Sequence, residues 1–171
     1  MQIVLLGYMG SGKSTLGRLL AKELNICFLD LDEYIEEVEK KSISAVFSTK
    51  GEVYFRKKEA KSLREILERT DDFVLSIGGG TPCYANNMNL ITEMTTKAFY
   101  LKVSIAELVQ RLSKEKEQRP LVKNIQDEKL PEYIGKHLFE RSFFYMKAHH
   151  TIDCDKKLPE EIVIQIKELL G

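Results

Sequence analysis

The sequence predicts an α/β fold in which helices cover both faces of a five-stranded parallel sheet. Two observations predict it. Short apolar runs alternate with longer stretches of helical periodicity, and polar or glycine-rich motifs directly follow three of these runs. In an open parallel sheet the carboxyl ends of the strands meet at one edge, where ligands bind. The expected strands are residues 3–6, 26–29, 73–77, 98–103 and 151–154.

The length and composition suit a single domain over residues 1–171, without a linker rich in proline or glycine. The 26 basic and 26 acidic side chains cancel, which argues against attraction to nucleic acid or anionic membranes. The three cysteines contain no C-x-x-C pair and fit reduced thiols in a cytosol. No targeting segment or long apolar stretch is visible. We therefore expect a soluble, cytoplasmic monomer that binds neither nucleic acid nor membranes.

The first expected strand leads directly into Gly-Tyr-Met-Gly-Ser-Gly-Lys-Ser at residues 7–14. The spacing G-x-x-x-x-G-K-[ST] is typical of a loop whose backbone N–H groups bind nucleotide phosphates. In such a loop Lys13 supplies positive charge and Ser14 a hydroxyl for magnesium. The leucines that follow recur at helical spacing, at Leu16, Leu19, Leu20 and Leu24. Strand, loop and helix thus occur in the required order and predict nucleotide binding, whereas a flexible turn is the weaker alternative.

Two aspartates, Asp30 and Asp32, follow the second expected strand and should lie beside the phosphate loop. A kinase needs a carboxylate to hold magnesium, directly or through water. It often needs another to orient the attacking hydroxyl and accept its proton. The alternative is structural, because Asp30 with Glu33 three residues later also resembles a helix capping box.

A long amphipathic helix is expected to begin at Gly51, and it carries Arg56 and Glu59 on one face. Arg56 is either a surface charge or a cation that Glu59 holds in place to bind a substrate carboxylate. The residues alone leave both interpretations open.

Three consecutive glycines, Gly78, Gly79 and Gly80, directly follow the third expected strand. Because they lack Cβ atoms, they let a ligand approach the backbone closely and permit positive φ angles. They also suit a simple turn. Their place at the carboxyl end of a strand favours contact with a substrate.

A polar segment at residues 113–131 carries Arg119, Pro120 and Leu121. A stretch of this length without strong periodicity is long for a compact domain and favours a mobile lid over a plain connection. From such a lid, Arg119 could reach the transferring phosphoryl group. A solvated arginine before a proline is the simpler interpretation.

Arg141 lies on an expected helix at residues 132–147 and is open to the same two interpretations. Phe139, Phe143 and Phe144 suggest that this helix packs tightly. An arginine that is partly buried there needs an anion as its partner.

Taken in order, these motifs resemble those of bacterial shikimate kinases over essentially the whole chain. The matching elements are G-x-x-G-S-G-K-S-T at residues 7–15, Asp30-x-Asp32, Gly51-Glu52 with Phe55-Arg56 and Glu59, Gly78-Gly79-Gly80, Arg119-Pro120-Leu121 and Arg141-x-x-x-Tyr145. The phosphate loop is shared by a large superfamily, whereas the ordered set is far more specific. The resemblance implies a three-layer P-loop kinase fold with a mobile lid. It also implies that the γ-phosphoryl group of ATP passes to the 3-hydroxyl of shikimate, giving shikimate 3-phosphate in aromatic amino acid (chorismate) biosynthesis.

The resemblance implies a role for each matching residue. The nucleotide phosphates would be bound by Gly10, Ser11, Gly12, Lys13, Ser14 and Thr15, with Arg119 reaching ATP from the lid. Magnesium would be held by Ser14 and, through its water shell, by Asp30. Asp32 would bind shikimate hydroxyls as the candidate base, so that the catalytic set is Lys13, Asp32 and Arg119. The acceptor site would lie in the helical region 32–62 and use Arg56, Arg141, Gly78, Gly79 and Gly80.

The chain departs from the shikimate kinase pattern at three places. Leu31 stands where family members commonly have serine or threonine, and Phe143-Phe144 where they commonly have proline and leucine. Asp155-Lys156-Lys157 stands where an arginine often flanks adenine, so the adenine contacts stay open. The closest alternative function is another small-metabolite kinase or a nucleoside monophosphate kinase. An alternative of a different class is a catalytically silent nucleotide-binding interaction domain.

Overall fold

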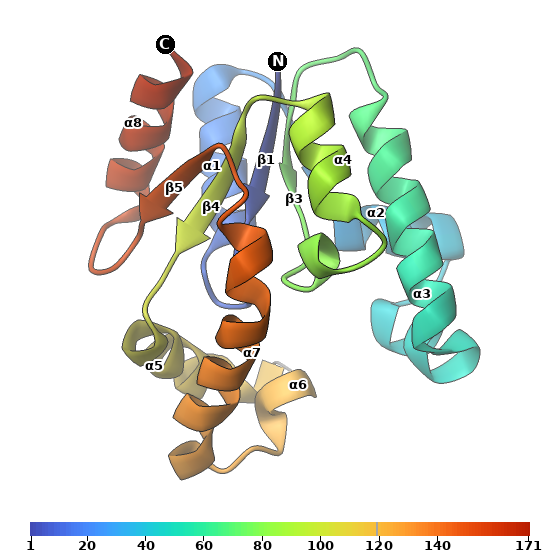
Figure 1. Cartoon of the computed structure of the whole chain (residues 1–171), viewed down its shortest axis with the longest axis vertical. Helices are drawn as coiled ribbons and strands as arrows, with labels where there is room; N and C mark the ends of the chain where they lie inside the picture. Colours follow the sequence, from blue (N-terminus) through green and yellow to red (C-terminus); the bar gives the residue numbers. More distant parts are fainter. Residues whose placement is uncertain (119) are drawn as a thin grey trace.

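A computed structural model describes residues 1–118 and 120–171 (Figure 1). Five strands pair in parallel in the order β2-β3-β1-β4-β5. They are β1 (Gln2–Leu6), β2 (Cys27–Asp30), β3 (Phe73–Ser76), β4 (Ala98–Lys102) and β5 (His150–Asp153). Each expected strand is present, with limits that differ by a single residue at most at each end. The predicted fold class, a parallel sheet covered by helices, is confirmed.

Helices cover both sides of the sheet (Figure 1). On one side α1 (Lys13–Leu24) packs against β2, β3 and α8 (Pro159–Leu170), while α3 (Ile43–Leu67) and α4 (Asn87–Met94) pack against each other on the other side. The remaining elements are the helices α2 (Leu31–Glu39), α5 (Ile105–Glu115), α6 (Pro120–Lys123) and α7 (Leu130–Tyr145), and the 3-10 turns η1 (Thr81–Cys83), η2 (Lys116–Gln118) and η3 (Asp127–Lys129). No helix in the described part of the chain is both long and apolar enough to span a bilayer.

The central strands form the core of the protein. The side chains of Ile3, Val4, Leu5 and Leu6 in β1 are fully buried, and every residue of β3 is buried too. This burial on both faces explains why these strands are continuous apolar runs without polar alternation. The carboxyl ends of the strands point toward the end of the molecule that carries α5, α6 and α7, opposite both termini (Figure 1). The motifs that follow the strands therefore gather at that end.

A helical segment that the sequence did not predict precedes the helix expected from Gly51 onward. α3 starts at Ile43, because Ser42 caps it by accepting a hydrogen bond from the backbone N–H of Ala45 at 3.2 Å. Gly51 then interrupts the helix with a φ of 81° and a ψ of 171°. The helix expected from Gly51 onward is thus present, and the segment from Ile43 joins it through this kink.

Of the three phenylalanines of α7, Phe144 packs against the core as expected, whereas the other two do not. Phe139 and Phe143 are 86% and 68% exposed. The buried face of the helix is formed instead by Ile134 and Tyr145, which lie three turns apart on the same side. The expectation of tight packing through Phe139 and Phe143 was wrong, because aromatic character alone does not show which face of a helix is covered.

Residues 113–131 contain more helical structure than expected of a loop. α5 extends into this segment, and η2, α6 and η3 follow before α7 begins. Val122 and Leu130 are buried in the core, whereas Leu121 is 67% exposed. Arg119 lies outside the described residues. The mobility expected of this segment stays a prediction.

The kink at Gly51 predicts opposite effects for two alanine substitutions. Gly51→Ala should lower the free energy of unfolding by about 1 kcal/mol, because a side chain at positive φ strains the backbone. Gly135→Ala is the matched control inside α7, where an added Cβ would lie 3.5 Å from Ile105 Cδ1 in ordinary contact. It should raise the free energy of unfolding by roughly 0.5–1 kcal/mol through helix propensity. Urea unfolding of both variants measures the difference, and shifts of the same sign would contradict it.

Candidate active site

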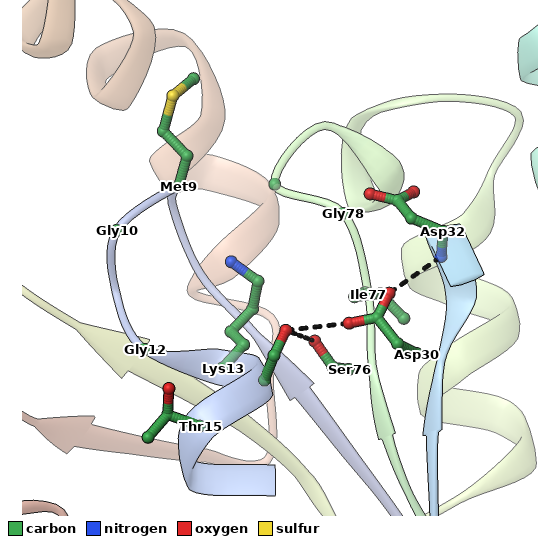
Figure 2. Close-up of a pocket in the computed structure, with 12 residues that line it drawn as sticks. Met9, Gly10, Gly12, Lys13, Thr15, Asp30, Asp32, Ser76, Ile77 and Gly78 are labelled. Carbon is green, nitrogen blue, oxygen red and sulfur yellow. Dashed lines mark hydrogen bonds between the residues drawn. The ribbon is translucent and has the colours of Figure 1, made fainter. Parts of the chain in front are cut away.

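The phosphate loop joins β1 to α1 and curls around the side chain of Lys13 (Figure 2). Lys13 Nζ donates hydrogen bonds to the carbonyl oxygens of Gly7 and Tyr8, at 2.8 and 3.0 Å. Gly10 and Gly12 have φ angles of 81° and 90°, which glycine adopts without strain. Because α1 begins at Lys13, its first backbone N–H groups point toward the loop and favour an anion there.

Beside the loop lie the side chains of Asp30 and Ser76 (Figure 2), and the Ser14 hydroxyl approaches both of them. Ser14 Oγ donates a hydrogen bond to Asp30 Oδ2 at 2.9 Å and lies 3.4 Å from Ser76 Oγ. The parallel pairing of β2 with β3 places Asp30 directly opposite Ser76. Ser76 was not among the predicted site residues, because its only signal in the sequence is a hydroxyl at the carboxyl end of an otherwise apolar strand. These oxygens have the chemistry that Mg²⁺ prefers.

Asp30 also caps α2, since Asp30 Oδ1 accepts a hydrogen bond from the backbone N–H of Asp32 at 3.0 Å. The capping interpretation is therefore correct for Asp30, and its second carboxylate oxygen still faces Ser14. Glu33 does not complete the capping box. It accepts a hydrogen bond from Arg18 Nη2 at 2.6 Å on the surface instead.

Asp32 lies in the first turn of α2, within the pocket that the phosphate loop borders. Burial raises the pKa of its carboxyl group to about 6, and the negative charges of Asp30 and Glu59 act in the same direction. The positive charge of Lys13 opposes them. A carboxyl group with a pKa near neutrality is suited to accept a proton from a substrate hydroxyl.

One open pocket of about 230 Å³ connects these groups at the carboxyl edge of the sheet (Figure 2). Its walls are formed by Met9, Gly10, Gly12, Lys13, Ser14, Thr15, Asp30, Asp32, Ser76, Ile77, Gly78 and Gly79. The predicted nucleotide residues thus share a single space with Asp32 and two of the three glycines. Ser11 is buried within the loop.

Two of the three glycines lie close to arginine side chains. A Cβ on Gly79 would lie 3.5 Å from Arg141 Nη1, and one on Gly80 would lie 3.1 Å from Arg56 Nη2. Among the described residues, none of the three glycines has a positive φ, so the conformational reason given from the sequence is corrected. Close approach is the reason that the structure supports.

Arg56 is held from one side by Glu59, as the second sequence interpretation proposes. Arg56 Nη1 donates a hydrogen bond to Glu59 Oε2 at 2.9 Å, and the arginine side chain is only 19% exposed. Glu59 is buried and accepts a further hydrogen bond from Thr81 Oγ1 at 2.7 Å. Arg56 is therefore not a free surface charge. Thr81 was not predicted, because it belongs to no motif in the sequence.

Arg141 is half-buried and approaches the pocket from α7. Its guanidinium carbon lies 5.5 Å from the centre of the Tyr8 ring in the phosphate loop. Tyr145, one turn further along α7, donates a hydrogen bond from its hydroxyl to the carbonyl oxygen of Gly79 at 2.5 Å. The change at Phe143-Phe144 thus leaves this contact intact. Leu31, the other departure beside the site, is fully buried in the core.

A phosphate loop and a desolvated carboxylate that share one pocket, at the carboxyl edge of this strand order, define a P-loop kinase for a small acceptor. The family model for shikimate kinase matches residues 9–171. A shikimate kinase from Flavobacterium psychrophilum is 46% identical over 169 residues, which cover 99% of this chain and 98% of the relative.

Two solved structures have the same fold. The shikimate kinase from Bacteroides thetaiotaomicron has a TM-score of 0.92 and 37% identity, and the match covers 99% of this chain and 98% of that one. The shikimate kinase from Acinetobacter baumannii, solved in complex with shikimate, has a TM-score of 0.86 and 32% identity, with 99% and 92% covered. The chain belongs to the shikimate kinase family. The predicted family and enzyme class are confirmed.

The raised pKa of Asp32 predicts how stability depends on pH. The folded protein binds this proton more tightly than the unfolded chain does. Its stabilising contribution is therefore complete below the unfolded pKa of about 4 and is lost as the pH rises through about 6. Asparagine does not ionise, so the Asp32→Asn variant should not lose this contribution as the pH rises. Relative to the wild type, the variant should gain on the order of 2 kcal/mol between about pH 4 and pH 7.5, measured by urea unfolding without ligands.

Asp155→Asn is the matched control of opposite sign. The backbone N–H of Ser104 donates to Asp155 Oδ1 at 2.8 Å and holds the pKa of that carboxyl group below its usual range. The contribution of Asp155 is therefore present above the unfolded pKa and lost as the pH falls, so Asp155→Asn should lose stability relative to the wild type as the pH rises. If both variants followed the same trend, the assignment of Asp32 would be wrong.

Proposed function

We propose that this protein transfers the γ-phosphoryl group of ATP to the 3-hydroxyl of shikimate, giving shikimate 3-phosphate for aromatic amino acid biosynthesis. One observation carries the proposal beyond family membership. The pocket that the phosphate loop borders also holds Asp32 and Gly79, which lies against Arg141, and Arg56 lies against the next residue, Gly80. The phosphate loop would bind the phosphate donor. Asp32 and the two arginines would bind the hydroxyl and the carboxylate of a hydroxy acid.

The nucleotide phosphates would lie in the loop from Gly10 to Thr15, where backbone N–H groups and the start of α1 face the pocket. Lys13 Nζ, now on two carbonyl oxygens, is close enough to turn to the phosphates. In phosphoryl transfer the charge develops on peripheral oxygens, so fixed positive groups contribute most. We therefore expect the positive charge of Lys13 to contribute more to the rate of phosphoryl transfer than the removal of the hydroxyl proton by Asp32. The predicted role of Arg119 is of the same kind and rests on the resemblance alone.

Ser14 Oγ and the Asp30 carboxylate fit a magnesium site, with Asp30 acting directly or through water. Both are hard oxygen donors, and they lie 2.9 Å apart. Mg²⁺ is usually held by one or two carboxylates, several waters and the substrate phosphates, so this small protein contribution suffices. When bound with ATP, the ion would neutralise charge on the β- and γ-phosphates.

Asp32 would orient the shikimate hydroxyl and accept its proton. The hydroxyl oxygen forms a bond to the γ-phosphorus as the bond from that phosphorus to the bridging oxygen breaks, and ADP leaves with the electron pair. The hydroxyl proton passes to the Asp32 carboxylate, whose pKa of about 6 allows it to be ionised at neutral pH and still accept a proton.

The carboxylate of shikimate would pair with Arg56 and Arg141. Arg56 Nε is buried and has no hydrogen-bond partner within residues 1–118 and 120–171. Glu59 already takes Nη1, and Glu52 lies 3.6 Å from the buried Nε, so the acceptor carboxylate would meet the guanidinium at Nη2, beside Gly80. The backbone of Gly78 to Gly80 would contact the ring of the acceptor.

Closure of the segment 113–131 would exclude water from the transferred group, which otherwise competes with the acceptor. The exposed Leu121 next to the buried Val122 supports a segment that is anchored at one point and solvated at another. A monomeric state and a cytoplasmic location remain part of the proposal.

A coupled assay for ADP tests the proposed reaction. With ATP, Mg²⁺ and shikimate, the purified protein should form ADP at a rate far above that of an acceptor-free control. Gluconate and nucleoside monophosphates, offered in parallel, should give rates close to that control, and so should shikimate after chelation of Mg²⁺. Turnover with a nucleoside monophosphate but not with shikimate would favour the nucleotide kinase alternative. Tight ATP binding without ADP from any acceptor would favour the silent domain.

Arg56→Lys tests the carboxylate-binding role. Lysine keeps the charge but loses the planar pair of donors, so the KM for shikimate should rise by about ten- to a hundredfold while the KM for ATP changes by less than about twofold. Arg64→Lys is the matched control on the same helix, because Arg64 is 59% exposed and lies 3.8 Å from Glu68. It should leave both constants unchanged. Equal rises in the two KM values for Arg56→Lys would remove Arg56 from the acceptor site.

A further inference from the structure

The short segment after the glycines is fixed in an unusual conformation. Ala85 and Asn86 are consecutive non-glycine residues with φ angles of 50° and 60°. Such strain persists only where the surroundings impose it. The buried side chain of Asn87 imposes it here, because its Nδ2 donates to the carbonyl oxygen of Thr81 at 2.9 Å and its backbone N–H donates to that of Tyr84 at 2.9 Å. The strained turn sets the direction of Tyr84.

Tyr84 places its ring on the guanidinium of Arg56. The guanidinium carbon lies 3.9 Å from the ring centre, which is the geometry of a close cation–π contact. Tyr84 is 39% exposed, so its ring is not part of the hydrophobic core. Within the described residues, the Tyr84 hydroxyl makes no hydrogen bond, and the contact therefore depends on the ring face.

The same segment supports Arg56 a second time, through Glu59. Thr81 Oγ1 donates to Glu59 Oε1 at 2.7 Å, and Glu59 Oε2 accepts from Arg56 Nη1 at 2.9 Å. The ring of Tyr84 covers the plane of the guanidinium while Glu59 takes one end of it. Glu52 Oε1 forms an ion pair with the buried Arg56 Nε at 3.6 Å, a separation that is beyond hydrogen-bonding distance.

We propose that Tyr84 is a positioning residue that sets the affinity for the acceptor carboxylate by fixing the plane of the Arg56 guanidinium. The inference rests on the proposed function, in which Arg56 binds that carboxylate. An arginine free to rotate would lose entropy on hydrogen-bonding a carboxylate, whereas one that is already oriented loses less. Tyr84 would therefore act on acceptor binding, with no part in the nucleotide site.

Three variants test this role. Tyr84→Leu removes the π face and keeps an apolar side chain, and it should raise the KM for shikimate by about three- to tenfold, the range that a half-buried cation–π contact supports. Tyr84→Phe keeps the ring face and should retain the wild-type KM. The matched control, Phe143→Leu, removes an exposed ring that lies 4.8 Å from Lys147 Nζ and should leave the KM unchanged. For each variant, kcat and the KM for ATP should stay within about twofold of the wild type, and thermal unfolding reports on the fold.

A double-variant cycle separates positioning from a general effect on structure. In an Arg56→Gln background, Tyr84→Leu should cause no further loss of kcat/KM for shikimate, because the group that it positions is gone. Equal losses in both backgrounds, an equal rise in the KM for ATP, or a Tyr84→Phe variant as impaired as Tyr84→Leu would each overturn the inference. A wild-type protein that forms no ADP with shikimate would overturn the proposed function itself. An active wild type with an unchanged KM in Tyr84→Leu would overturn only the role of Tyr84.

Discussion

The parallel register of β1, β2 and β3 is the constraint on which the site depends. It aligns Asp30 with Ser76 and Leu5 with Ser76, so that the phosphate loop, the carboxylates of α2 and the glycines after β3 all leave the sheet at the same level. A slip of one residue in β2 would turn its side chains to the opposite face of the sheet. The buried apolar residues of β1 and β3 make such a slip costly. The core therefore sets the positions of polar groups that it does not itself contact.

The electrostatics of the site follow from this crowding. Asp30, Asp32 and Glu59 lie close together, and the three carboxylates differ in the groups that stabilise their negative charge. Asp30 accepts hydrogen bonds from Ser14 and a backbone N–H, Glu59 is neutralised by Arg56, and Asp32 is left with the raised pKa. The carboxylate with the fewest partners is the one whose proposed role is to take up a proton. Among the described residues, the partners that Asp30 and Glu59 have are thus lacking at Asp32, where burial and these two negative charges raise the pKa.

Much of the fold was predictable because it depends on local pattern. The apolar runs predict the limits of the strands. The spacing of the glycines and Lys13 predicts the loop between β1 and α1, because that spacing is typical of loops that bind phosphate. The helical segment capped by Ser42 was not predicted, because the prediction of a helix rested on the motif that begins at Gly51. The roles proposed for Arg119 and the segment 113–131 remain predictions. What sequence could not show was which side chains meet across the fold.

Ser76 and Tyr84 illustrate that limit. Neither belongs to a motif, and each gains its significance from one partner that is distant in the chain, Ser14 or Arg56. The exposure of Phe139 and Phe143 has the same cause, because the covering of a helix face depends on the elements around it. Local periodicity finds the elements, whereas the neighbours of a given side chain follow from how those elements assemble.

Gly79 lies where the phosphate loop and α7 approach each other through one residue. A Cβ there would lie 3.4 Å from both the Gly7 carbonyl oxygen and the Met9 backbone nitrogen of the phosphate loop, and the Gly79 carbonyl oxygen accepts the hydrogen bond from Tyr145. The backbone of Gly79 thus lies between the phosphate loop and the Tyr145 hydroxyl, close to the one and hydrogen-bonded to the other. A side chain at this position would crowd the loop on which the proposed nucleotide site depends. The absence of a side chain at Gly79 therefore sets how closely α7 and the phosphate loop can approach each other around the shared pocket.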